Sequence, residues 1–166
     1  MTKLNIDVSN KSVPLDSGVA YVFGITSLKD KLQIADSLIE TSALSKVDLR
    51  ALGARDTFEH VTRIQGPEGS VYLAIGLGDE ELSDEHFRQL AGAAVRHLAD
   101  FEKVVIGLPN KSSQSSLAAI EGSLLAHYEF NEYKSVKKTR KLSSVTVLSK
   151  ARWPTKRTKT PACPSV

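Results

Sequence analysis

Residues 71–148 alternate between short apolar runs and longer segments with helical spacing, and this alternation constrains the fold more than any other feature of the chain. Three runs rich in Val, Ile and Leu, at 70–75, 103–108 and 144–148, are typical of buried strands. Two helical segments lie between them, joined by short connections. The order strand, helix, strand, helix, strand predicts a parallel sheet with right-handed crossovers. We therefore expect an α/β fold of three layers, in which a mainly parallel sheet has helices on both faces.

Each of the two helical segments has a recognisable start. Ser83 is a good N-cap residue, and Asp84 and Glu85 follow it in the first turn, where the helix dipole favours negative charge. Ser112 or Ser113 is expected to cap the second helix. Both segments repeat apolar residues at helical spacing: Phe87, Leu90, Ala91, Ala94, Val95 and Leu98 in the first, and Leu117, Ile120, Leu124, Leu125 and Tyr128 in the second.

The first half of the chain predicts three further strands. Residues 19–23 form an apolar run between two glycines, which is typical of a buried strand, and residues 4–8 alternate as its expected neighbour. Residues 58–64 and 70–75 flank the Gly- and Pro-containing segment 65–69. Two β-rich runs across such a turn predict a β-hairpin.

The region between these strands predicts a helix and a helical turn. Apolar residues recur at helical spacing over 30–44, which indicates an amphipathic helix with Asp36 and Glu40 on its solvent side. A short helical turn is expected near Leu49 and Leu52, ending at Gly53 as a C-cap.

Composition limits the class of protein. A length of 166 residues with 41% hydrophobic and 25% charged residues fits one domain. The single cysteine, Cys163, fits a reducing cytosol and argues against a disulfide framework or a zinc ribbon. No apolar run reaches the roughly 18 residues of a membrane span, and the polar start has no signal-peptide core. We expect a soluble, cytoplasmic protein.

The net charge of +3 conceals an uneven distribution. From residue 134 onward there are ten Lys or Arg and no acid, a net charge of +10, whereas residues 1–133 have twelve Lys or Arg against nineteen acids, a net charge of −7. Residues 150–166 also contain three prolines and lose all periodicity. We expect a domain of residues 1–149 followed by a disordered basic tail of residues 150–166.

Two stretches of the chain share a pattern with a known family. The strand at 71–75 leads through Gly76-Leu77-Gly78 into a helix rich in small residues, and a later helix ends in Tyr128-Glu129-Phe130 with Tyr133-Lys134 behind it. In this order and spacing, the two stretches resemble the amino-terminal domain of the leucyl (cytosol) aminopeptidase family. The resemblance is strong over 71–135 and extends loosely back to residue 19.

The resemblance implies a macro-domain-like fold in a non-catalytic domain. In that family the domain is joined to a carboxy-terminal catalytic domain with two divalent metal ions, Zn or Mn, and the full-length enzyme, a hexamer, removes amino-terminal residues such as Leu from peptides. The catalytic signature Asn-Thr-Asp-Ala-Glu-Gly-Arg is not found in these 166 residues. We therefore assign no catalytic, cofactor-binding or metal-binding residue and predict that the chain alone is inactive. Its expected partners are the catalytic domain and further copies of the full-length protein. We expect no association with a membrane.

Other chemistry-bearing residues are better explained structurally. The densest acidic cluster fits a loop that enters the first turn of a helix, although a two-metal hydrolase also needs convergent carboxylates. The histidines show no metal-ligand spacing, and the serines form a loop and helix cap rather than a nucleophile elbow. These residues are Asp79, Glu80, Glu81, Asp84 and Glu85; His60, His86, His97 and His127; and Ser112, Ser113, Ser115 and Ser116.

Two features keep a binding module open as an alternative function. Gly76-Leu77-Gly78 lies between a strand and a helix, where an α/β sheet could receive a phosphate or a nucleotide such as ADP-ribose. Its spacing is not Gly-x-Gly-x-x-Gly, and acids follow it, so we favour a plain turn. The basic segment 134–141, with Lys156, Arg157 and Lys159 behind it, could bind nucleic acid weakly through phosphates but lacks interleaved aromatic residues. We favour a solvated segment.

Overall fold

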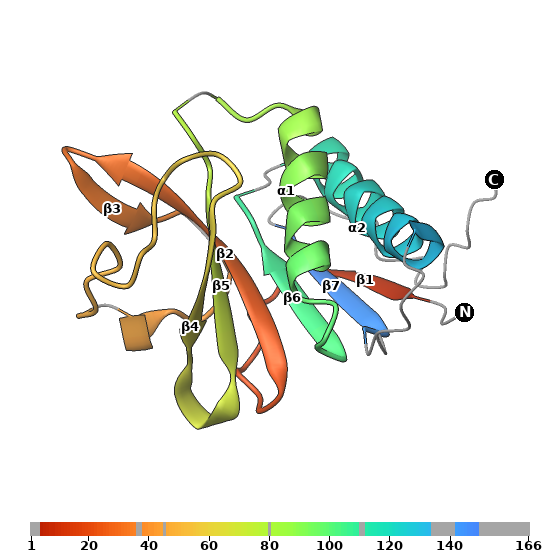
Figure 1. Cartoon of the computed structure of the whole chain (residues 1–166), viewed down its shortest axis with the longest axis horizontal. Coiled ribbons are helices and arrows are strands. Elements are labelled where there is room, and N and C mark those ends of the chain that lie inside the picture. The colour runs from red at the N-terminus through yellow and green to blue at the C-terminus, as the bar shows by residue number, and fades with distance from the viewer. Residues whose placement is uncertain are drawn as a thin grey trace.

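The structure, a computed structural model, describes residues 4–35, 38–44, 46–79, 81–109, 112–133 and 142–149, with the backbone only over 129–133. These residues form an α/β fold (Figure 1). In chain order the elements are β1 (Asn5–Ser9), β2 (Val19–Leu28), β3 (Lys31–Ile34), the 3-10 helix η1 (Ser42–Leu44), β4 (Val61–Gln65), the 3-10 helix η2 (Pro67–Gly69), β5 (Val71–Gly76), α1 (Asp84–His97), β6 (Lys103–Gly107), α2 (Ser113–Tyr133) and β7 (Ser144–Leu148).

The strands form one mostly parallel sheet of seven. Its order is β1-β7-β6-β2-β5-β4, with β3 paired to β2 outside this path. β1, β7, β6, β2 and β5 run parallel, whereas β4 pairs antiparallel with β5 and β3 antiparallel with β2. The predicted α/β class with a mainly parallel sheet is therefore confirmed, and so is the hairpin of β4 and β5.

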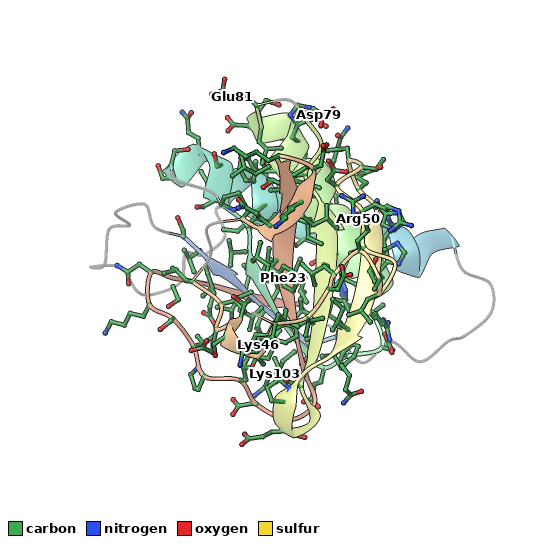
Figure 2. All side chains as sticks on the ribbon, turned by 90° about the vertical axis from the view of Figure 1, so that its left-hand side faces the viewer. Phe23, Lys46, Arg50, Asp79, Glu81 and Lys103 are labelled. Atoms are coloured by element: carbon green, nitrogen blue, oxygen red, sulfur yellow. The ribbon has the colours of Figure 1, made fainter. Side chains whose placement is uncertain are left out.

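β2 is buried on both faces of the sheet. Ala20 and Val22 face the helices, and Tyr21 and Phe23 face the opposite side, each no more than 1% exposed. Because successive side chains alternate between faces, a strand covered on both sides requires a continuous apolar run, which residues 19–23 provide. Figure 2 shows Phe23 in the middle of the packed side chains.

α1 and α2 lie side by side on one face of the sheet (Figure 1). α1 begins where the sequence predicts, because Ser83 caps it: the Ser83 side chain accepts a hydrogen bond from the His86 amide. Buried residues such as Leu90 and Ala94 point from α1 into the core. The amphipathic spacing of this helix is thus used as expected.

The two helices approach closely at two glycines. A methyl group at Gly122 of α2 would overlap the carbonyl oxygen of Arg88 on α1, and one at Gly92 would lie 3.3 Å from the Gly122 oxygen. The Arg88 guanidinium bridges the helices as well, since it pairs with Glu121 at 2.9 Å and with Glu85. These hydrogen bonds, first that to Glu121 and then that to Glu85, raise the pKa of Arg88.

The other face of the sheet is covered by residues 38–44, which include η1, and by residues 46–54. Two buried tyrosines fasten chain segments on this side. The hydroxyl of Tyr72 donates to the Glu40 carbonyl at 2.8 Å, and that of Tyr21 donates to the Pro14 carbonyl at 3.0 Å. The layers are therefore a helix pair, a sheet, and a cover of irregular chain with one short 3-10 helix.

The prediction of a helix over residues 30–44 is wrong. Residues 31–34 form β3, which pairs with β2, and Lys29 and Asp30 make the turn with φ of 51° and 65°. Two successive residues with positive φ are typical of a tight hairpin turn, whose strand pairing overrides the helical spacing of the apolar residues. Glu40 is exposed as expected, and Asp36 lies outside the described residues.

The position expected for the first strand is also wrong. Residues 5–9 pair with β7 and not with β2, because β5 and β6 occupy both edges of β2. The expected helical turn is present, since the amides of Leu52 and Gly53 donate to carbonyls three residues earlier. Gly53 has a φ of +95°, the left-handed conformation of a C-cap glycine.

Candidate functional site

The carboxyl end of β5, with the turn Gly76-Leu77-Gly78, is the place where a ligand of an α/β sheet would be expected. Gly76 packs directly against backbone: a methyl group there would overlap the Thr57 carbonyl oxygen and lie 2.8 Å from that of Arg55. Gly78 has a φ of +77°, a conformation that favours glycine. The close approach of backbone at Gly76 and the positive φ of Gly78 thus explain both glycines without a ligand.

The amides of this turn bind the protein's own carbonyl groups. Gly76 N–H donates to the oxygen of His60 at 2.8 Å, Leu77 N–H to that of Ile25 at 3.0 Å, and Gly78 N–H to that of Asp56 at 2.8 Å. A phosphate site at a glycine-rich turn needs backbone amides that point at the ligand. None of these three is available, so the turn joins β5 to β2 and to the chain before β4.

A shallow cavity of about 500 Å³ lies beside this turn. Its lining includes Asp56, Phe58, Asp79 and His86. Phe58 and His86 contact each other edge to face, with ring centroids 5.2 Å apart. The lining therefore combines an aromatic wall with two carboxylates, and it offers little to an anionic ligand.

His86 also completes the cap of α1. Its Nδ1 accepts a hydrogen bond from the Ser83 amide at 2.9 Å, while its own amide donates to the Ser83 hydroxyl at 3.3 Å. This reciprocal pair is a capping box in which His stands where Glu or Gln is usual. Sequence reasoning missed this role, although the spacing of Ser83 and His86 carries the signal.

The other histidines are far apart in the fold. His60 Nε2 lies 3.1 Å from the Gly53 carbonyl oxygen, His97 is exposed in the last turn of α1, and His127 is fully buried in α2. His60 directly precedes β4, His97 is on α1 and His127 is on α2, so the fold does not bring these three side chains together.

The acidic cluster is spread along the entry to α1. Asp79 and Glu81 are exposed, and Figure 2 shows both at the end of the molecule opposite Lys103. Asp84 accepts a hydrogen bond from the Ser115 hydroxyl at 3.4 Å, and Glu85 pairs with Arg88. Glu80 lies outside the described residues. Within the described ranges, no group of three or more His, Cys, Asp or Glu could hold a metal ion.

The serines at the start of α2 serve as a cap and an anchor. Ser112 Oγ accepts from the Ser115 amide at 3.1 Å, as an N-cap does. Buried Ser116 Oγ bonds to Ser149 Oγ at 2.7 Å, which ties the first turn of α2 to the end of β7. Ser113 is exposed.

The basic segment 134–141 and Lys156, Arg157 and Lys159 lie outside the described residues. None of the helices that the structure describes is long and apolar enough to cross a membrane.

The fold defines the class as a mostly parallel α/β domain with a helix pair on one face. A family model described as "Cytosol aminopeptidase family, N-terminal domain" matches residues 25–137. The "Probable cytosol aminopeptidase" of Rhodococcus jostii is 40% identical over 124 residues, which are 70% of this chain and 24% of the relative. That of Leifsonia xyli is 34% identical over 87 residues, 52% of this chain and 18% of the relative. The chain belongs to the cytosol aminopeptidase family and carries its N-terminal domain.

Solved structures support the same fold. A mutant of tomato leucine aminopeptidase matches with a TM-score of 0.67 and 16% identity, covering 92% of this chain and 34% of that one. The bottromycin maturation enzyme BotP matches with a TM-score of 0.53 and 20% identity, covering 79% of this chain and 27% of that one. The chain spans about a quarter of the length of the curated relative from R. jostii.

Proposed function

We propose that this chain is the non-catalytic amino-terminal domain of a cytoplasmic metallo-aminopeptidase, which removes amino-terminal residues such as Leu from peptides. In this proposal residues 1–149 form the domain, residues 150–166 form a basic tail, and the domain assists the assembly of a hexamer or its regulation. The family match over 25–137 carries the proposal.

The two divalent ions, zinc or manganese, belong to the catalytic half in this proposal. The described residues offer no group of three or more His, Cys, Asp or Glu placed to hold an ion. Because a two-metal centre needs convergent ligands, the donor set of these residues does not fit it. We therefore derive no catalytic step through a metal in this chain.

Hydrolysis of leucine p-nitroanilide tests the non-catalytic role. The purified 166-residue chain, with manganese or zinc, should give no turnover, while the full-length R. jostii relative assayed in parallel should hydrolyse the substrate. Turnover that copurifies with the chain and scales with its concentration would contradict the proposal.

Assembly is tested with a joined protein, in which residues 1–149 of this chain precede the part of the R. jostii relative that follows its own matched segment. We expect this joined protein to reach the molecular mass of the R. jostii enzyme in light scattering and to hydrolyse leucine p-nitroanilide. The R. jostii part alone should assemble less completely. A joined protein that stays at the mass of one chain and is inactive would overturn the proposal.

The binding-module alternative is tested by titration. Because all three turn amides bind protein carbonyls, we expect no heat of binding with ADP-ribose. Micromolar affinity would favour a ligand-binding domain. Duplex DNA should bind weakly and with a steep salt dependence, as for contacts to phosphates alone. Binding that persists at high salt would favour a nucleic-acid-binding module.

A further inference from the structure

We draw no further inference here: the strongest candidate, the shallow cavity beside the turn at residues 76–78 that is lined by Asp56, Phe58, Asp79 and His86, belongs to the site already described, and nothing that the structure describes there, beyond two carboxylates near the start of α1, shows which ligand would fill it.

Discussion

Replacing Gly122 by Ala should destabilise the domain, although Ala is the better helix former by about 1 kcal/mol. The added methyl group would overlap the Arg88 carbonyl oxygen and lie 2.8 Å from the Arg88 carbonyl carbon. Both atoms belong to a helix backbone, so α1 and α2 must separate by about 1 Å to restore ordinary contact, and such a gap forfeits a quarter to a half of each dispersion contact. Overpacking at the upper end of its usual range costs about 3 kcal/mol.

The net loss is therefore about 2 kcal/mol, which lowers the melting temperature of a chain of this size by about 6 °C. Gly92→Ala is the matched control, because it has the same helix propensity gain and its methyl group would lie 3.3 Å from the Gly122 oxygen and 3.4 Å from Arg96 Nη1. We expect this variant within about 0.5 kcal/mol of the original or slightly above it. Urea unfolding followed by far-UV circular dichroism measures both. Equal stability of the two variants would refute the close-approach argument.

Four further predictions concern hydrogen bonds and titration. Tyr72→Phe removes the hydrogen bond to the Glu40 carbonyl and should lower the free energy of unfolding in urea by about 1 kcal/mol. An unchanged free energy of unfolding would show that this bond does not fasten the segment around Glu40 to the sheet. Burial, then Glu40 and Tyr21, raise the pKa of Tyr72, so the neutral hydroxyl is favoured in the folded state and its contribution is lost as pH rises above about 10. The original chain should therefore lose more stability than Tyr72→Phe between about pH 9 and about pH 11, on either side of the ordinary tyrosine pKa of about 10. Partial desolvation of the His97 ring, then Arg96 and Arg63, lower the pKa of His97. Its contribution to the stability of the fold is therefore complete above about pH 6.5 and falls below that pH. An NMR midpoint at or above about 6.5 for His97 would contradict this direction. His86→Gln should keep the cap of α1 and His86→Ala should cost about 1 kcal/mol, as measured by thermal melting; equal melting temperatures would contradict the capping role.

Local signals in the sequence were enough to predict α1 and the hairpin of β4 and β5. Ser83 and the apolar spacing behind it predict α1, and the Gly- and Pro-containing segment between β4 and β5 predicts their hairpin. Both depend on interactions within a few residues or on a single repeating period. The antiparallel pair of β2 and β3 lacked such a signal, because its turn is Lys29-Asp30 instead of the glycine-containing pairs that usually take positive φ.

The candidate site depended on long-range contacts. The sequence shows that Gly76-Leu77-Gly78 lies at a strand end, but the carbonyl groups that occupy its amides come from Ile25, Asp56 and His60. Nothing local in the sequence places these groups beside the turn. The spacing of the glycines and the acids that follow them were enough to predict a plain turn. That the backbone amides of the turn are already bound to carbonyl groups could be seen only in the fold.

The pairing of β1 with β7 has a consequence for synthesis on the ribosome. Asn5 is opposite Ser144, so the first strand of the sheet obtains its partner only after nearly the whole domain has been translated. At 5–20 residues per second this takes roughly 7–28 s. During that interval β2 also waits for β5 and β6, which supply both of its parallel neighbours. The nascent chain therefore holds β2, whose residues 19–23 are buried on both faces of the finished sheet, without these partners. In this state chaperone binding or misassembly competes with folding.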